Sequence, residues 1–356
     1  MEELDPSETA QKIDLFNLSQ AELETMMKEL GQPKFRAKQL WEWIYHHFAA
    51  EHEEMTNLPK ALREALADKT QFGDLTPVVT ELSSDEHTEK VLFECHDGRL
   101  IETVLMRYEK RNTICMSSQA GCAMGCVFCA TGQMGFMRHL TVGEMVGQFI
   151  YFARKLKAED ARISNVVMMG MGEPLHNYDN TLAAVDRMTD PKGIDLGNRK
   201  ITISTVGMIP AMKRYADEQR QTPLAVSLHA ATDAERTALI PPNKRWPIAE
   251  LMDACRYTIE KTGRRLTFEW ALINGKNDTI EQADKLGALL QGMLCHVNLI
   301  PLNPTKGFDG RPSNPERVEA FINKLSDYGV SATVRVRRGI DIQAGCGQLR
   351  DRVVNG

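Results

Sequence analysis

The sequence predicts an α/β protein built as a partial (β/α) barrel of about six units, with a small helical N-terminal domain and a short antiparallel β extension. From about residue 112 onward, short apolar segments alternate with amphipathic helical ones, which indicates a parallel sheet covered by helices. At 356 residues the chain is long for one core, unless that core is a barrel of repeated units. The active site of such a fold is expected at the carboxyl ends of the strands.

Three parts follow one another along the chain. Residues 1–75 are expected to form a helical accessory domain, since three segments there have helical periodicity; this domain could touch RNA or serve as a packing cap. Residues 76–111 contain strand-like segments and a His-Asp-Gly turn, which predict the β extension. Residues 112–350 are expected to hold the barrel, with strands at 113–117, 164–169, 200–205, 224–228, 266–270, 296–300 and 332–336.

Composition suggests the compartment. The N-terminal residues are acidic and polar, with no basic region followed by an apolar one, so no secretion signal is expected. No apolar run reaches the length that a membrane helix needs. A cytoplasmic location without a membrane partner is therefore expected. In that reducing compartment the eight cysteines are expected to bind metal or perform chemistry, not to form a disulfide framework.

The net charge of −5 argues weakly against a general nucleic-acid coat but leaves room for local basic patches. Two basic segments stand out, at residues 261–265 and 335–338. Each by itself is most simply interpreted as solvated surface charge.

A cysteine triplet follows the first barrel strand. Cys122, Cys126 and Cys129 have the spacing C-x3-C-x2-C within a glycine-rich loop, and glycines let a backbone wrap closely around a bulky group. A [4Fe–4S] cluster usually has four thiolate ligands, so three would leave one iron open. The alternative is a zinc site completed by His139 or a distant cysteine. Structural zinc sites usually pair two such elements, and the sequence has no second pair.

This triplet at the end of a first barrel strand resembles the radical S-adenosylmethionine (SAM) superfamily. The resemblance implies that SAM chelates the open iron and is cleaved to a 5′-deoxyadenosyl radical. Gly172 and Glu173, in a Met-Gly-Glu-Pro sequence after the second strand, resemble the motif that binds the SAM amino group. Polar residues after later strands are further candidates for SAM contacts; the positions are Ser204, the Ser227-Leu228-His229 sequence and Asn303.

Two cysteines outside the triplet are further candidates for chemistry. Cys346 lies between glycines after the last strand, which is typical of an exposed, mobile thiol. Cys115 ends the first strand, where it either faces the barrel mouth or is a small buried strand residue. Cys95, Cys255 and Cys295 lie in apolar periodic segments and are interpreted as structural.

The motifs around Cys122–Cys129, Glu173, His229 and Cys346 together resemble the RlmN/Cfr family of adenine methyltransferases over essentially the whole chain. The resemblance implies methylation of carbon 2 of adenosine 2503 in 23S rRNA and of adenosine 37 in tRNA, with two SAM per turnover. One SAM methylates Cys346. The radical from the second removes hydrogen from that methyl group, the carbon adds to adenine, and a transient Cys115–Cys346 disulfide releases the product.

Glu102 lies in an otherwise apolar strand, where a carboxylate is suited to proton transfer. It matches the proton acceptor of the family, the alternative being an outward-facing strand residue. An electron donor such as flavodoxin and a monomeric state are also expected. Two other functions stay open: a C8 adenine methyltransferase giving antibiotic resistance, and a non-catalytic metal-containing RNA-binding module.

Overall fold

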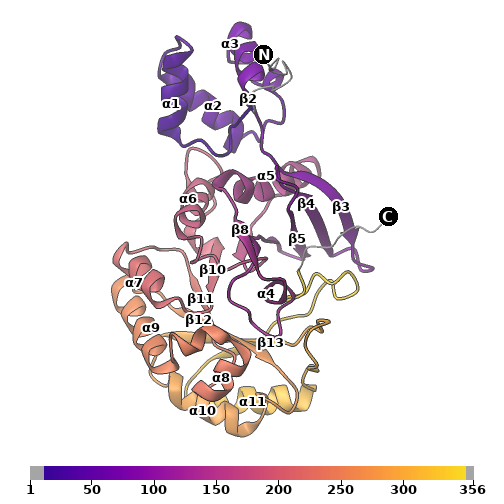
Figure 1. Cartoon of the computed structure of the whole chain (residues 1–356), viewed down its shortest axis with the longest axis vertical. Coiled ribbons are helices and arrows are strands. Elements are labelled where there is room, and N and C mark those ends of the chain that lie inside the picture. Colours follow the sequence, from indigo (N-terminus) through magenta and orange to yellow (C-terminus); the bar gives the residue numbers. More distant parts are fainter. Residues whose placement is uncertain (1–11, 350–356) are drawn as a thin grey trace, which may run out of the picture.

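The computed structural model describes residues 12–349, and its centre is one sheet of ten strands (Figure 1). Seven of them are parallel, in the order β6-β9-β10-β11-β12-β13-β14. Among the described residues β14 pairs only with β13, so the sheet is open there. The predicted partial barrel is confirmed, with six strand–helix units and a seventh strand. The parallel strands are β6 (Arg111–Cys115), β9 (Asn165–Met168), β10 (Ile201–Thr205), β11 (Leu224–Ser227), β12 (Leu266–Leu272), β13 (Cys295–Pro301) and β14 (Ala332–Val334).

The antiparallel extension continues this sheet. Strands β3 (Thr76–Leu82), β4 (Thr88–Glu94) and β5 (Leu100–Tyr108) form a meander, and β5 pairs with β6 so that Val104 faces Cys115. The sequence predicts this antiparallel extension but not how it joins the barrel. A tight β5–β6 connection makes it one edge of the barrel sheet.

Helices cover the sheet on the outside (Figure 1). The long α5 (Val142–Ala158) is capped by Thr141, whose hydroxyl accepts a hydrogen bond from the Glu144 N–H. No helix among residues 12–349 is long and apolar enough to cross a membrane. The other barrel helices are α6 (Tyr178–Thr189), α7 (Ile209–Asp217), α8 (Asp233–Leu239), α9 (Ile248–Thr262), α10 (Ile280–Leu290) and α11 (Pro315–Asp327), with 3₁₀ turns at Asn198–Lys200 and Pro241–Lys244.

The N-terminal helices α1 (Gln20–Glu29), α2 (Phe35–Tyr45) and α3 (Lys60–Lys69) sit at one end of the molecule (Figure 1). Leu40, Trp41, Ile44 and Tyr45 are buried on one face of α2, as its periodicity predicts. This part docks on α6, since Trp41 donates to Asp190 over 2.8 Å and Arg187 donates to backbone carbonyls before α1. It also contains the short strands β1 (Ile13–Asp14) and β2 (Thr70–Gln71) and a 3₁₀ turn at His52–Glu54.

Candidate active site

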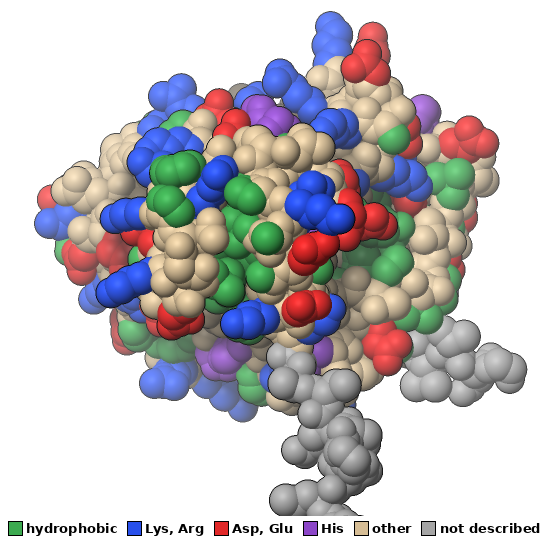
Figure 2. All heavy atoms as spheres, turned by 90° about the horizontal axis from the view of Figure 1, so that it is seen from above, with side chains coloured by type: hydrophobic (Ala, Val, Ile, Leu, Met, Phe, Trp, Pro, Cys, Tyr) green, Lys and Arg blue, Asp and Glu red, His purple; other side chains and the backbone are tan. Residues whose placement is uncertain are grey.

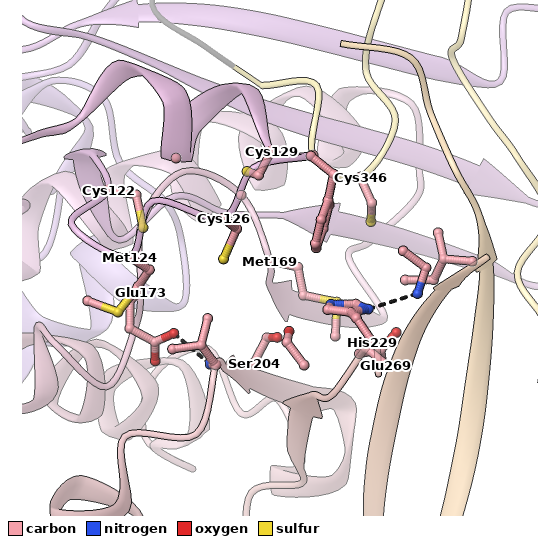
Figure 3. A pocket seen from close by; sticks show the side chains of 18 of the residues that line it. Cys122, Met124, Cys126, Cys129, Met169, Glu173, Ser204, His229, Glu269 and Cys346 are labelled. Carbon is pink, nitrogen blue, oxygen red and sulfur yellow. Dashed lines mark hydrogen bonds between the residues drawn. The ribbon is translucent and has the colours of Figure 1, made fainter. Parts of the chain in front are cut away.

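A cavity opens at the carboxyl ends of the parallel strands, between the sheet and the loop of the cysteine triplet. That loop also holds the short elements β7 (Gln119–Gly121), α4 (Ala130–Met134) and β8 (Phe136–His139). Figure 3 shows the triplet along one side of the cavity, with Glu173, Ser204, His229 and Glu269 along the other. The cavity brings together most residues proposed from the sequence: Cys122, Cys126, Cys129, Gly172, Glu173, Ser204, Ser227, His229, Asn303 and Cys346.

The three triplet thiols suit a bulky metal centre. Burial raises the pKa of Cys122 to about 12, and burial together with the two other thiols raises that of Cys126. Three thiolates would therefore repel one another here unless cationic metal neutralised them. The loop is also tightly wrapped, since a Cβ on Gly132 would lie 2.9 Å from the backbone of Cys126.

A single zinc ion fits this arrangement less well. Its ligands must converge to within about 2.3 Å of one point, and no three His, Cys, Asp or Glu side chains between residues 12 and 349 do so. His139, the suggested fourth ligand, is outside the cavity and lies 3.0 Å from the Gln119 amide. The three thiols line one wall of the cavity, and three thiolates are the protein donors of a [4Fe–4S] cluster with one open iron, so the residues present fit that group.

Glu173 is a buried carboxylate on the opposite wall. It accepts hydrogen bonds from the N–H groups of Val206, at 2.8 Å, and Leu175, at 3.1 Å. Burial raises its pKa to about 7, although these hydrogen bonds lower it. A buried carboxylate of this kind gains most from a cationic ligand, which is what the ammonium of SAM provides.

Gly172 allows the Glu173 loop to approach the cysteine loop. Its φ is +102°, and a Cβ there would lie 2.6 Å from the Cβ of Gln119. The Gln119 amide oxygen accepts from the Glu173 N–H over 2.8 Å, and its nitrogen contacts the Nδ1 atoms of His139 and His176. The two loops are thus joined directly through Gln119.

His229 has a defined protonation state. Its Nδ1 accepts a hydrogen bond from the Ala271 N–H over 2.8 Å (Figure 3), so the neutral ring carries its proton on Nε2. Burial lowers the pKa of His229 to about 3, which keeps the ring neutral. Its φ of +59° is uncommon for a residue other than glycine and is typical of functional sites. His229 can therefore donate from Nε2 to a bound ligand.

The remaining proposed SAM contacts differ in their positions. Ser204 and Ser227 are half-buried and line the cavity. Leu228 does not: its side chain is fully buried in the core and its N–H donates to the Glu269 carbonyl. Asn303 lines the cavity but donates its amide to the carbonyl of Cys346 over 3.1 Å.

Cys346 lines two cavities. It borders the cavity of the triplet and also a smaller one that contains Cys115. The thiol is half-buried and less exposed than its glycine-rich loop predicts, because the Cys346 and Gly347 carbonyls accept hydrogen bonds from Asn303 and Ala130. Burial raises the pKa of Cys115 to about 12, the nearby Cys346 raises it further, and Arg335 lowers it. The two thiols are therefore electrostatic neighbours.

Glu102 lies outside both cavities. It is buried on β5 and its carboxylate is 3.0 Å from the ammonium of Lys90. The apolar surroundings expected from the sequence are thus interrupted by a cation from β4, because Lys90 and Glu102 lie diagonally across the β4–β5 ladder. Lys90 also donates to the carbonyl of Ile342, over 2.7 Å, in the loop that carries Cys346.

Sequence reasoning missed two other residues. Glu269 lines the main cavity and accepts from the Asn298 amide over 2.7 Å, and burial raises its pKa to about 6. The sequence could have indicated Glu269 as a site residue, since it is the one charged residue of an apolar strand. Arg236 is fully buried and donates to the carbonyls of Val206, Ser227 and Leu228, which fixes the ends of β10 and β11. Nothing in its helical sequence indicates this.

Comparisons with known proteins agree with this site. Residues 13–71 match the ribosomal RNA large subunit methyltransferase N-terminal domain, and residues 116–286 match the radical SAM superfamily. A dual-specificity RNA methyltransferase RlmN 1 from Myxococcus xanthus is 53% identical over 98% of this chain and 96% of its own. A probable dual-specificity RNA methyltransferase RlmN from Clostridium perfringens is 46% identical over 95% and 96%.

A solved structure supports the same assignment. The crystal structure of a radical SAM methyltransferase from Sphaerobacter thermophilus is 48% identical and superposes with a TM-score of 0.92, over 95% of this chain and 99% of its own. A radical SAM methyltransferase uses an iron–sulfur cluster and SAM, and the cavity described above brings together the thiols and polar residues that would hold them. These matches leave no place for the non-catalytic RNA-binding alternative. The chain belongs to the RlmN family of radical SAM RNA methyltransferases.

Proposed function

We propose that the protein methylates carbon 2 of adenosine in 23S rRNA and in tRNA, at the two nucleotides that the family resemblance implies. The observation that carries this proposal is the position of Cys346, which borders both the cavity of the cysteine triplet and the cavity that holds Cys115. A methyl carrier needs access to both a methyl source and a resolving thiol. The names of the relatives, which specify dual-specificity RNA methyltransferases, support the choice of substrates.

Cys122, Cys126 and Cys129 would hold the [4Fe–4S] cluster. When the cluster and SAM are bound, they supply the 5′-deoxyadenosyl radical that removes hydrogen from a methyl group. Glu173 would accept the SAM ammonium, since its buried carboxylate lies on the facing wall. His229 would donate its Nε2 proton to a SAM oxygen, and Ser204, Ser227 and Asn303 would make further polar contacts from neighbouring strands.

Cys346 would carry the methyl group. Its thiolate displaces S-adenosylhomocysteine from SAM, and Arg335, which lines the same small cavity as Cys346, places a positive charge beside that thiolate. After hydrogen removal, the methylene carbon on Cys346 bonds to carbon 2 of adenine, and the adduct gives up one electron and the carbon-2 proton to restore the aromatic ring. The Cys115 thiolate then attacks the sulfur of Cys346. An S–S bond forms, the carbon–sulfur bond breaks, and the leaving carbon takes up a proton to become the methyl group of the released base.

Glu102 would accept the proton that adenine loses at carbon 2. The neighbouring Lys90 ammonium favours the ionised carboxylate that this role requires. Glu102 is buried away from the main cavity, so the RNA or the Cys346 loop must shift for direct proton transfer.

Several partners follow from this function. The cluster needs an electron donor such as flavodoxin, and we infer a monomer acting in the cytoplasm, where both RNA substrates occur. Seen from the N-terminal end, the surface carries Lys and Arg side chains among apolar and acidic ones (Figure 2). The Lys and Arg side chains would contact an RNA backbone, which supports a substrate-binding role for the N-terminal helices.

The test is an assay of reconstituted holoenzyme, without oxygen, on a tRNA transcript and a 23S rRNA fragment. Mass spectrometry of the digested RNA should find 2-methyladenosine in both. Cys346→Ala should keep the cluster and SAM cleavage but transfer no methyl group, whereas Cys295→Ala, a matched change outside both cavities, should retain activity. A product with 8-methyladenosine would establish the C8 alternative instead.

A further inference from the structure

The basic segment at residues 335–338 lies beside the reacting thiols. Arg335, Val336, Arg337 and Arg338 follow β14 and line the same small cavity as Cys115 and Cys346. Three guanidinium groups within four residues therefore stand at the carboxyl end of the last strand, where the substrate base must enter. Solvated surface charge does not account for this placement.

The inner and outer arginines have different surroundings. Arg335 is half-buried, its N–H donates to the Leu299 carbonyl over 2.8 Å, and its charge faces the two thiols and Glu269. Arg337 is exposed and has one long hydrogen bond, of 3.4 Å, to Asn303. The inner arginine thus serves the thiols, while Arg337 is available to a ligand outside.

The Arg338 guanidinium lies over an aromatic ring. Its guanidinium lies 4.6 Å from the centre of the Tyr108 ring, which Arg111 also contacts at 4.4 Å. The carboxylate that faces Arg338 is Asp85, which is half-exposed and 3.9 Å away. Because solvent screens this pair, Asp85 neutralises the charge of Arg338 only weakly. The lining of the small cavity includes three arginines and no Asp or Glu among the described residues.

We propose that Arg337 and Arg338 bind RNA phosphates next to the target adenosine. This inference rests on the proposed function. The target base must leave its stack to reach Cys346, and this brings its neighbouring phosphates to the rim of the cavity. Guanidinium groups bind phosphate oxygens in pairs. Val336, 65% exposed between them, offers an apolar contact for the ribose or base that becomes unstacked.

The other basic segment supplies a matched control. Lys261, in the last turn of α9, and Arg265, directly before β12, are exposed, so they lie at the amino ends of the strands, opposite the cavity. Lys261 also stands over a tyrosine ring, 5.4 Å from the centre of Tyr257. The control therefore removes the same number of positive charges, two, at the opposite end of the barrel.

The experiment compares Arg337→Gln/Arg338→Gln with Lys261→Gln/Arg265→Gln in reconstituted holoenzyme. Fluorescence anisotropy would give the Kd for a labelled tRNA transcript from about 50 to 300 mM salt. We expect the first variant to bind roughly tenfold more weakly near physiological salt, with a slope of log K against log salt smaller by about 1.5 for two lost phosphate contacts. The control should match the wild type.

A second readout separates RNA binding from thiol chemistry. Methylation of Cys346 by SAM needs no RNA, and mass spectrometry of the protein should find it within about a factor of two of wild type in both variants. Unchanged RNA affinity and salt slope would overturn the proposal. So would loss of Cys346 methylation, or slower reduction by the electron donor with RNA binding intact, since the segment would then serve the thiols or the donor. Failure of the wild type itself to bind RNA would overturn the proposed function as well.

Discussion

Replacing Lys90 with methionine should destabilise the region that links the β extension to the Cys346 loop. The Lys90 ammonium is 1% exposed and donates to three oxygens: Glu81 at 2.8 Å, Glu102 at 3.0 Å and the Ile342 carbonyl at 2.7 Å. An ammonium has three N–H donors, so each is used. Methionine keeps most of the volume but removes the charge and all three bonds.

The expected cost follows from the burial of the partners. Removing one member of a buried ion pair costs about 3–5 kcal/mol, because the remaining charge stays desolvated. Glu102 is 2% exposed but Glu81 is 31% exposed, and solvent screens the second pair. A loss of about 3 kcal/mol is therefore expected. Lys155→Met is the control: its partner Glu89, on the other face of β4, is also 2% exposed but keeps a second cation, since Arg107 lies 3.4 Å away. A smaller loss of about 1 kcal/mol is therefore expected.

Hydrogen exchange measured by mass spectrometry suits this test, because it reports local opening where the whole chain need not unfold in one step. Peptides from β4, β5 and residues 339–348 should exchange faster in Lys90→Met, and Cys346 should be methylated more slowly. Adding Glu102→Gln should recover part of the stability, since it removes the buried charge. If the double variant is no more stable than Lys90→Met, or if the two lysine variants cost the same, this reasoning is wrong.

Two further predictions concern the main cavity. Burial raises the pKa of Glu269 from 4.5 to about 6. The folded protein therefore binds a proton at Glu269 more tightly than the unfolded chain does, and the free energy of unfolding falls as pH rises from 4.5 to about 6. Glu269→Gln should therefore gain about 2 kcal/mol relative to wild type between pH 4 and pH 8, measured by unfolding without SAM; a pH-independent difference would contradict this. Gly172→Ala should lose SAM binding in equilibrium dialysis, because φ is +102° and its Cβ would meet Gln119. Gly263→Ala, at a φ of +64° with nothing within 4 Å, should cost only backbone strain of about 1 kcal/mol and bind SAM normally.

Periodicity predicted the fold well. The strands of the barrel are short and apolar because both faces are covered, and they stand out between amphipathic helices. Local sequence also fits the helix start that the structure has, since Ser19 forms a reciprocal pair of hydrogen bonds with Glu22 at the start of α1. Periodicity does not reveal how strands pair, so the continuation of the extension into the barrel through β5 and β6 was not foreseen.

Parts of the candidate site were predictable because strand ends carry them. The carboxyl ends of parallel strands meet at one edge of a sheet, so Glu173, Ser204 and His229 could be grouped from local sequence alone. Contacts between segments that are far apart in the sequence could not be predicted in this way. The pairing of Lys90 with Glu102 depends on the β4–β5 register, and the hydrogen bonds of Arg236 to three carbonyls depend on how a helix packs over strand ends.

The loop of Cys346 is held by its backbone and not by its reactive side chain. The carbonyl of Gly347 accepts from the Ala130 N–H over 2.7 Å in the helix that follows the triplet, and the Cys346 carbonyl accepts from Asn303 over 3.1 Å. Lys90 holds the Ile342 carbonyl from the opposite side. Anchors of this kind fix the Cα position while leaving rotation about the Cα–Cβ bond available. The sulfur can then turn between the cavity of the triplet and the cavity of Cys115, as a methyl carrier that meets two different partners must.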